Sequence, residues 1–519
     1  MDPTNLYGIC IGSIVFLLVV LSFCHSLFQA IFKRARRFFL RQIYFSLLPR
    51  WLGGYFRLSR YCGLLIILYI NANICLLALD LQDKSDFIRR LGRAALTNLV
   101  PLCAGGRFNP IANLLAIRTD NYLLLHKCIG IVFIIETAMH SVLSWNGDVI
   151  DLRRWSDKAG LIAASSVGAL ALTSFPTIWR WMYESSSALH LAFSTTAVIS
   201  LWFHLTPTTL IETPRLYLVL AISAFIFVKA LRLLKILFIN ISAASISTAS
   251  IQQIGNGIEI QVSMPRPLKY RAGQFVFLSI PRLAAFQFHP FQVAWEYLGN
   301  DGRQVLVFVI QPRHGFTGRL RLANPTKDYT AFIEGPYGNP TALDQYGTVL
   351  LFATGIGIAG QLSYMKEQLR LYRGWQTKTR RHVLFWEMDA EEYRYWVNEW
   401  INEILSWNID YVDIQLYVRG QFLAKDAEKG VSMKKGERLL RLTLNYFAME
   451  PENLIHAEIQ RREGRGRMLV SLCTDSSTAR TVTKVMRPLL GDDIDLVELD
   501  FCPWSGSRRR EEPIPGVCD

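Results

Sequence analysis

The chain has 519 residues, 51% of them hydrophobic, and its 56 basic and 42 acidic residues give a formal net charge of +14 at pH 7. It is too long for one ordinary domain and too apolar for a wholly soluble protein, so we expect a membrane half and a soluble half. Basic clusters beside the hydrophobic stretches carry much of the charge and favour anionic lipid headgroups, and no nucleic-acid-binding motif accompanies them.

Seven hydrophobic stretches occupy the first half of the chain, and nothing comparable follows them. They lie near residues 7–32, 61–79, 92–117, 121–144, 159–178, 183–205 and 214–237. The third is interrupted by Pro101 and by a Gly-Gly-Arg sequence at 105–107. The first is longer than the apolar part of a secretory signal and no basic segment precedes it, so we expect an uncleaved anchor.

Charged residues beside these stretches predict how the chain crosses the membrane. Arg34, Arg37 and Arg41 belong to a basic cluster directly after the first stretch, which places this loop in the cytosol and the N-terminus outside. Seven spans then return the chain to the cytosol, where basic Arg232 agrees with the count, while acidic Asp83 falls outside. The fourth and sixth spans run outward in this topology.

Four histidines repeat one spacing within those two spans. His126 and His140 lie fourteen residues apart, and so do His190 and His204. At ~3.6 residues per turn this is almost four turns, so the members of each pair share one helix face about 21 Å apart. Ionisable side chains are costly in hydrocarbon and usually turn inward toward a partner or cofactor. The pattern predicts an inner site of His126 and His190 and an outer site of His140 and His204.

Two b-type haems would account for these sites, with the iron of each bound by two imidazoles. A zinc ion is the weaker alternative, because its ligands must converge within ~2 Å of one ion and two histidines about 21 Å apart on one helix cannot do so. A lone histidine on an apolar face, such as His25, is more often incidental than a ligand.

The soluble half begins with a pattern of short strands. A Ser/Ala/Ile-rich linker is expected at 240–250, and strands are expected at Ile258–Val262, Gln274–Ile280 and Gln304–Gln311. Glycine and proline bound these runs, which favours an antiparallel barrel or sandwich.

A second pattern follows the Gly-Pro-Tyr-Gly turn that begins at Gly335. Strand Thr348–Ala353 leads through the glycines of a Gly-x-Gly-x-x-Gly turn into a helix at 361–372. Such a turn is a phosphate cradle when a strand and a helix flank it, although the motif alone is a weak signal that a tight strand-to-helix turn would explain better. The glycines concerned are Gly355, Gly357 and Gly360.

Strands and helices continue to alternate toward the C-terminus. Strands are expected at His382–Trp386 and Met468–Cys473, with a helix at 395–407 after the first, which predicts a doubly wound parallel sheet. Two charged segments, 420–436 and 458–467, are expected to be solvated loops.

In this order the segments resemble the ferric reductase and NADPH oxidase family, and most closely the fungal ferric or metalloreductase transmembrane components. The resemblance implies that a His-Pro-Phe strand lies against the flavin of FAD, that a Gly-Gln element precedes it and that a Gly-Phe-Thr turn holds the pyrophosphate. Relatives carry Ser or Thr where Gln292 stands, so one flavin hydrogen bond must differ here. The corresponding FAD-binding residues are Gly273, Gln274, His289, Pro290, Phe291, Gly315, Phe316 and Thr317.

The resemblance also implies the domain organisation of a multi-domain membrane protein. Residues 1–240 form an α-helical transmembrane haem-binding bundle of about seven spans. Residues 241–340 form an antiparallel β-barrel FAD domain, and 341–505 form an α/β doubly wound nicotinamide-binding domain, the two together being ferredoxin-reductase-like. Residues 506–519 are expected to be a disordered tail.

The implied activity is that of an oxidoreductase. Electrons pass from cytosolic NADPH through FAD, the inner haem and the outer haem to ferric or cupric chelates outside, which transporters of the reduced metal then take up. Multi-pass insertion in the plasma membrane, with cytosolic C-terminal domains, and metal-uptake transporters as partners follow from the same resemblance. A superoxide-generating oxidase is one alternative, and a non-enzymatic haem-binding membrane partner with a degenerate nucleotide site is another.

Two departures from the family concern the nucleotide. Relatives place Cys-Gly-Pro beside the nicotinamide, whereas here Thr474 follows Cys473, the residue expected to contact it. Relatives often use an arginine after the strand at 382–386 for the 2′-phosphate, whereas Met388 and Asp389 stand here, and an acidic residue better suits a free ribose hydroxyl.

NADPH is therefore the expected donor by resemblance and NADH the alternative. Arg380, Arg381 or Arg394 could supply the missing cation from nearby. Near the C-terminus, Phe501 or Trp504 is expected to cover the flavin ring or to pack in a final strand.

Overall fold

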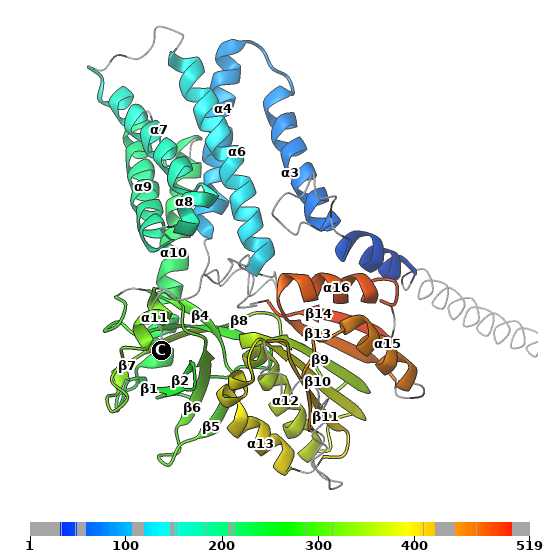
Figure 1. The fold of residues 1–519 in the computed structure, drawn as a ribbon. Coiled ribbons are helices and arrows are strands. Elements are labelled where there is room, and N and C mark those ends of the chain that lie inside the picture. The colour runs from blue at the N-terminus through cyan, green and yellow to red at the C-terminus, as the bar shows by residue number, and fades with distance from the viewer. Residues whose placement is uncertain are drawn as a thin grey trace, which may run out of the picture. The chain divides into compact units, whose positions relative to one another are not determined.

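The computed structural model describes residues 32, 34–46, 48, 59–105, 119–145, 151, 153–181, 183–205, 209–210, 213–285, 287–313, 315–407, 409–420, 442–462, 464, 466–491 and 493–500. The chain divides into two compact units (Figure 1). The helical unit comprises Cys62–Ile241 with Tyr337–Asn339, and the nucleotide unit comprises Ser242–Pro336, the chain from Pro340 onward and the segment before Cys62. The predictions for Phe501, Trp504, the tail, the first apolar stretch up to residue 31 and the loop at 421–436 lie outside the described residues.

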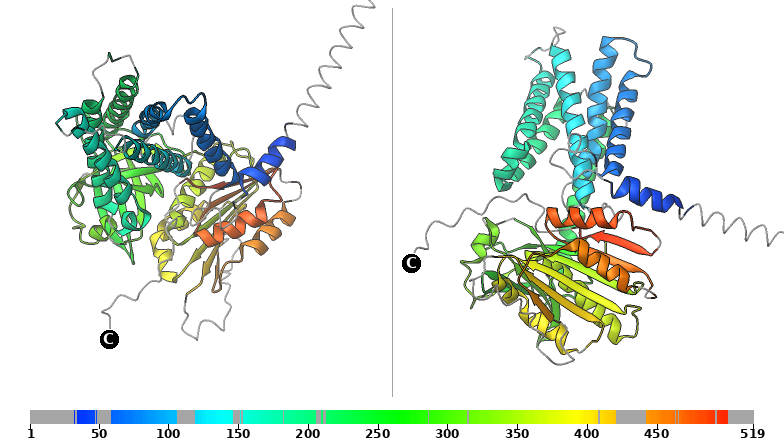
Figure 2. Two further views of the ribbon diagram at one scale, coloured as in Figure 1. Left: turned by 90° about the horizontal axis from the view of Figure 1, so that it is seen from above. Right: turned by 45° about the vertical axis from the view of Figure 1, so that its right-hand side comes forward.

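The helical unit is built from antiparallel neighbours. Helix α4 packs beside α6, and α7 packs beside α9, as both views of Figure 2 show for this unit. The helices are α3 (Arg60–Ala78), α4 (Lys84–Ala104), α6 (Thr119–Trp145), α7 (Trp155–Thr173), α8 (Pro176–Trp181), α9 (Tyr183–His204) and α10 (Arg215–Asn240).

Helices α3, α6, α9 and α10 carry apolar residues on their inner and outer faces alike. Leu96, Phe133 and Leu218 pack in the core, while Ile226 and Leu234 of α10 are exposed. A helix that is apolar all round is typical of a membrane span. Four helices in the described residues are long and apolar enough to cross a membrane, and they are Arg60–Ala78, Asn121–Trp145, Ser185–His204 and Arg215–Asn240.

The expected count of seven spans is thus only partly matched. Helix α4 occupies much of the third apolar stretch but begins at Lys84, eight residues earlier, and its first turns carry several arginines. Helix α7 occupies the fifth, but Asp157 and Lys158 lie in its first turn and small residues follow. Both are long helices, but their charged and small residues make them less apolar than the other four spans.

The first part of the nucleotide unit contains two antiparallel sheets. One has the order β5-β6-β2-β1-β7 and the other β4-β3-β8. The strands expected from the sequence are present, and β1 begins in the last residues of the predicted linker at 240–250 and extends beyond it. The strands are β1 (Thr248–Ile254), β2 (Gly257–Ser263), β3 (Phe275–Ser279), β4 (His289–Gln292), β5 (Trp295–Leu298), β6 (Gln304–Ile310), β7 (Tyr329–Thr330) and β8 (Phe332–Tyr337).

The second part is a parallel sheet of order β12-β11-β10-β9-β13-β14, as predicted. From β9 the chain adds strands β10 to β12 on one side and strands β13 and β14 on the other, so the strand order reverses beside β9 although all strands stay parallel. Ligands of open α/β sheets bind at such a switch point. The strands are β9 (Thr348–Thr354), β10 (Arg381–Met388), β11 (Val412–Val418), β12 (Leu442–Asn445), β13 (Met468–Cys473) and β14 (Ile494–Glu498).

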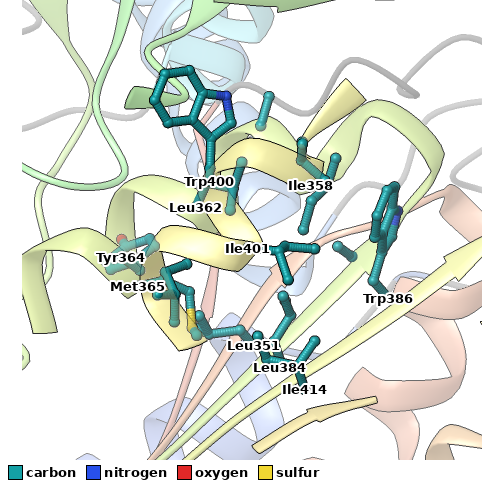
Figure 3. Close-up of a cluster of buried hydrophobic side chains, with 14 of the residues drawn as sticks. Leu351, Ile358, Leu362, Tyr364, Met365, Leu384, Trp386, Trp400, Ile401 and Ile414 are labelled. Atoms are coloured by element: carbon teal, nitrogen blue, oxygen red, sulfur yellow. The ribbon is translucent and has the colours of Figure 1, made fainter. Parts of the chain in front are cut away.

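Helices cover both faces of this sheet because alternate residues of each strand point to opposite sides. Leu351, Leu384 and Ile414 pack against α12 (Ile358–Arg373) and α13 (Asn398–Ser406), with Trp400 and Ile401 contributed by α13 (Figure 3). Phe352 and Phe385 face the other side, toward α15 (Pro451–Arg461) and α16 (Ser476–Met486).

The prediction of a solvated loop at 458–467 was wrong for its first part. Glu458 lies in α15, is only 2% exposed, and accepts hydrogen bonds from both Nε and Nη2 of Arg381 at 3.0 and 2.8 Å. Arg381 also donates to Asp413 at 2.9 Å. The charge that suggested solvent exposure is neutralised inside the fold.

The basic segment before the helical unit belongs to the nucleotide unit. Arg36 donates to the Gly491 carbonyl at 3.1 Å and to Asp495 at 3.2 Å, and Arg41 donates to the Leu490 carbonyl at 2.6 Å. This segment and the nucleotide-binding sheet therefore lie on the same side of any membrane.

Candidate functional site

The rings of His126 and His190 face each other across the helical unit. Their centroids lie 6.4 Å apart, with an angle of 52° between the planes. If one metal ion were bound by both rings, each metal–nitrogen bond would be about 2 Å long, and each ring centre would lie ~1 Å beyond its nitrogen. The two ring centroids would then lie about 6 Å apart. The spacing suits one iron ion between the two imidazoles.

The other two histidines share a different feature, an acceptor on the neighbouring helix. Nδ1 of His140 lies 2.9 Å from the carbonyl oxygen of Ile88, and Nδ1 of His204 lies 3.0 Å from that of Ser156. A carbonyl only accepts, so Nδ1 must donate, which leaves the lone pair on Nε2. Metal-ligating histidines are commonly oriented by such a bond.

A glycine lies beneath each of these two rings. A Cβ added at Gly92 would lie 3.2 Å from Cε1 of His140, and one added at Gly160 would lie 2.5 Å from Nδ1 of His204. Each glycine follows the accepting carbonyl by four residues, Ile88 on α4 and Ser156 on α7. The two helix pairs thus repeat one local arrangement. Sequence reasoning missed both glycines, although a glycine inside an apolar helix was the available signal.

The described residues fit haem better than an ion held by protein alone. No group of three or more His, Cys, Asp or Glu side chains that could hold a metal converges within the described residues. Haem needs only axial ligands from the protein, because its ring occupies the other positions. His190 has its Nδ1 3.2 Å from the Ser174 hydroxyl, and Nδ1 of His126 is buried without a partner in the described part of the chain.

We expect Gly160→Ala to reduce haem binding at the outer site. The methyl group would force either the His204 ring off the Ser156 carbonyl or the two helices apart. Gly168→Ala on the same helix is the matched control, since a Cβ there meets nothing within 4 Å. Haem content of the purified proteins measures the effect: about one of two haems lost in the first variant and none in the second. Equal content in both variants would contradict this role for Gly160.

Several predicted FAD-binding residues come together at the small sheet. The ring of His289 stacks on that of Phe316 with centroids 4.4 Å apart, and Phe291 lies 6.3 Å from the same ring. Thr317 accepts a hydrogen bond from the backbone of Arg313 at 2.9 Å, which closes the turn. Strand β4 and the turn at 315–317 therefore share one aromatic cluster, in which the Phe316 ring is buried and the Thr317 hydroxyl is already hydrogen-bonded.

The Gly273 turn packs against the nucleotide-binding sheet. Gly273 has φ of +83°, and a Cβ there would lie 2.1 Å from the Tyr364 hydroxyl of α12. Its backbone N–H donates to Ser363 at 3.3 Å. Glycine is required both by the backbone conformation and by this close approach. Sequence reasoning did not find these contacts of Ser363 and Tyr364 with the predicted FAD-binding Gly273.

The glycine turn after β9 lies at the switch point of the sheet. A Cβ at Gly357 would lie 1.9 Å from the carbonyl oxygen of Cys473, and one at Gly360 would lie 3.4 Å from Gln292 of the FAD-binding part. The first turn of α12 has no side-chain cap, so its backbone N–H groups suit an anion such as a dinucleotide pyrophosphate. Gly357, Gly360, Cys473 and Gln292 are thus brought together.

Arg380 and Arg381 cannot bind a 2′-phosphate at this edge. Arg381 pairs with Thr348 at the start of the parallel strands, six residues or about 20 Å from Glu387 at the carboxyl ends. Its guanidinium is already held by Glu458 and Asp413. Arg380 precedes it in the chain and lies at the same end of the strand.

The cations described at the carboxyl ends of β10 and β11 have acidic partners. Arg419 lies 3.0 Å from Asp389 and 3.8 Å from Glu387, and Arg394 lies 3.4 Å from Glu391. Burial raises the pKa of Glu387, while the Met449 N–H and then Arg419 oppose that rise. Arg419 was missed because it follows a strand that the sequence pattern did not predict.

The chain has paired histidines in apolar helices, then a β region of two sheets, and then a parallel α/β sheet. This order defines a membrane-bound oxidoreductase that depends on flavin and nicotinamide. Residues 91–201 match the family model of a ferric reductase like transmembrane component, 239–341 match an FAD-binding domain, and 346–490 match a ferric reductase NAD binding domain. The chain belongs to the ferric reductase and NADPH oxidase family.

Curated relatives fall into two groups. Ferric reductase transmembrane component 4 of Saccharomyces cerevisiae is 26% identical over 277 residues, which is 50% of this chain and 37% of that protein. Ferric/cupric reductase transmembrane component 2 of the same yeast is 25% identical over 274 residues, with the same coverage of 50% and 37%. Respiratory burst oxidase homolog protein A of Solanum tuberosum is 32% identical over 134 residues, covering 22% of this chain and 14% of that protein. The chain spans little more than a third of its yeast relatives.

Proposed function

We propose that this protein transfers electrons from cytosolic NAD(P)H across a membrane to ferric or cupric chelates. The observation that carries the proposal is the pair of histidine sites, in which Nδ1 of His140 and of His204 is fixed by a main-chain carbonyl. Such fixed imidazoles in a membrane helix suit axial ligation of haem. The FAD- and NAD-binding domains of the same chain supply the other end of the path.

The residues of the chain bind and orient the groups that carry electrons. When bound, FAD would accept hydride from the nicotinamide and release single electrons, which two haems would carry across the membrane. His126 and His190 would hold the inner haem, and His140 and His204 the outer one. His289 and Phe291, backed by the buried Phe316 ring, would lie against the flavin, and the first turn of α12 would bind the dinucleotide pyrophosphate.

The proposed path through the membrane retains seven spans, with α4 packed against α6 and α10, and α7 packed against α9. The hydrogen bonds of Arg36 and Arg41 to the nucleotide unit support a cytosolic loop after the first span. The plasma membrane is the proposed location, with partners that transport the reduced metal. Fungal relatives named as ferric or cupric reductases support this acceptor.

Oxygen is a second candidate acceptor, because respiratory burst oxidase homologs are among the relatives. The described residues contain no metal-binding cluster that would favour a metal chelate. Transfer from an exposed haem edge needs only a brief encounter, so this observation does not separate the two acceptors.

NADPH is the donor expected by resemblance, and NADH is favoured by one observation. At the carboxyl ends of β10 and β11, Glu387 and Asp389 surround Arg419, so in this described group two carboxylates face one guanidinium. A free ribose diol can donate to these carboxylates, whereas a 2′-phosphate would be repelled by them.

We expect NADH or NADPH to reduce the haem of the purified full-length protein anaerobically when FAD is present. Haem absorbance measures the rate with each nucleotide, and FAD omission is the control. If neither nucleotide reduces the haem, the protein is not the proposed enzyme and a non-enzymatic haem partner becomes the better description. If reduction occurs, the rate of ferric-chelate reduction relative to the yield of superoxide assigns the acceptor.

A further inference from the structure

A buried carboxyl group lies inside the helical unit between the two histidine sites. Glu136 is on α6, ten residues after His126 and four before His140, and it is only 3% exposed. Acidic residues within membrane spans are rare, and they mark proton or ion pathways more often than structural positions. No step of the proposed electron transfer uses this residue.

Glu136 is the end of a hydrogen-bonded network from three helices. Its Oε2 accepts from Nδ2 of Asn98 on α4 at 2.9 Å. Asn98 also donates to Asn73 at 2.9 Å and accepts from the Tyr69 hydroxyl at 2.9 Å, both on α3. Oε1 of Glu136 has no hydrogen-bond partner within the described residues.

Among the described residues, the network contains no cation that would balance an ionised carboxylate at Glu136. Tyr69 is the titratable group that faces Glu136 from α3, and α4 presents the neutral Asn98. Arg93 of α4 lies five residues before Asn98, about 140° around the helix. Arg90 of the same helix is paired with Asp86 at 2.8 Å. On α6 itself His140 is one turn away, and its ring has a separate partner, the Ile88 carbonyl.

An ionised group with one neutral donor is costly in such surroundings, so its charge must be balanced by something bound nearby. A proton on Oε1 would do this, because Asn98 donates to Oε2 and makes Oε2 the carbonyl oxygen of the acid. A ferric haem at the outer site would also balance the carboxylate, because the three positive charges of the iron exceed the two negative charges of the porphyrin ring by one. Reduction of that haem removes the charge and leaves the proton as the remaining counter-charge.

We propose that Glu136 is a proton-binding site coupled to the redox state of the outer histidine site. Each electron that arrives at the outer site is accompanied by one proton, which converts the Glu136 carboxylate to the acid. Delivery of the electron to the acceptor releases that proton. The electron comes from NAD(P)H and the proton from water, so the net charge inside the bundle is unchanged. This inference rests on the proposed function, because it requires a haem at His140 and His204.

The test is a redox titration of the haems in the purified full-length protein from mildly acidic to mildly alkaline pH. The outer haem is identified as the component missing from His204→Ala. Its midpoint potential is expected to fall as pH rises, by up to about 59 mV for each tenfold change in proton concentration. In Glu136→Gln this slope should disappear, and the potential should stay near the acid limit of the wild type.

Infrared difference spectra give a readout that does not depend on turnover. Reduction of the wild type should produce the C=O stretching band of a protonated carboxylic acid, and Glu136→Gln should lack it. Glu259→Gln is the matched control, because Glu259 is also buried, at 7% exposure, but lies in β2 of the nucleotide unit. That variant should keep both the band and the pH slope.

Asn98→Ala provides a second variant should Glu136→Gln fail to bind haem. Loss of the Asn98 donor disfavours the ionised carboxylate, so the pH range of the slope should move upward while both haems remain bound. An unchanged slope in Glu136→Gln, or a potential that responds to sodium or potassium ions at fixed pH, would overturn the proposal. Absence of two haems from the wild-type protein would instead overturn the proposed function, so the two failures can be told apart.

Discussion

Replacing His204 with alanine is expected to remove one of two haem signals and to abolish transfer to the external acceptor. The imidazole is held by the Ser156 carbonyl, and no other described side chain of α9 shares that position. His140→Ala should have the same effect, whereas His126→Ala and His190→Ala should remove the inner haem. The measurement is the reduced-minus-oxidised absorbance spectrum together with haem content.

The order of the two sites gives this prediction a sharper form. In His204→Ala, NAD(P)H should still reduce the remaining inner haem. In His190→Ala, the remaining outer haem should no longer be reduced by nucleotide, because the inner site lies on its path. His456→Ala is the control, since His456 is exposed on α15. Unchanged spectra in all four variants of the paired histidines would refute their assignment as ligands.

Arg381→Ala is expected to destabilise the nucleotide unit by about 3–5 kcal/mol, because it leaves buried carboxylates without a counter-charge. Glu458 is 2% exposed and Asp413 is partly buried, and Arg381 bonds to both. The thermal midpoint of the purified protein should fall by roughly 10 °C. Arg461→Ala is the matched control, because Arg461 contacts the same Glu458 at 3.0 Å but its side chain is 60% exposed. A loss of less than about 1 kcal/mol is expected there.

The same ion pair sets a pH dependence of stability. Burial alone would raise the pKa of Glu458, but the hydrogen bonds and charge of Arg381, and then Arg461, hold it below the ordinary value. The pKa of Glu458 is lower in the folded state than in the unfolded state, where it is about 4.3. Its ionised carboxylate therefore stabilises the fold above about pH 4.3, and this contribution is lost as the pH falls through the lower pKa of the folded state. Thermal unfolding at decreasing pH should show this acid loss in the wild type and not in Arg381→Ala. Parallel curves for the two proteins would contradict it.

Local patterns allowed much of the fold to be predicted. The strand at Met468–Cys473 has the predicted bounds, because a short apolar run between charged segments has few alternatives. The glycine turn after β9 was also found from its local pattern. The structure adds that a side chain at Gly357 would collide with the carbonyl oxygen of Cys473. The pairing of His126 with His190 followed from helical spacing, whereas their role as haem ligands stays a prediction.

Most of the features that sequence reasoning missed depend on contacts between distant segments. Gly92 and Gly160 matter only because a histidine of another helix lies over each of them. Glu458 looked solvated because its partner Arg381 is 77 residues away in the chain. For the same reason Arg381 was considered as a nucleotide ligand, although the parallel register puts it at the opposite end of the sheet.

The acceptors that orient His140 and His204 are main-chain oxygens, at Ile88 and Ser156. Every amino acid supplies a carbonyl, so substitutions at those two positions leave the bond intact, provided the helices keep their distance. Only the histidine and the glycine four residues after the carbonyl are restricted in type. The outer site therefore tolerates extensive sequence drift around it, and a search for its counterparts in divergent chains should compare helix geometry and glycine placement before side-chain identity.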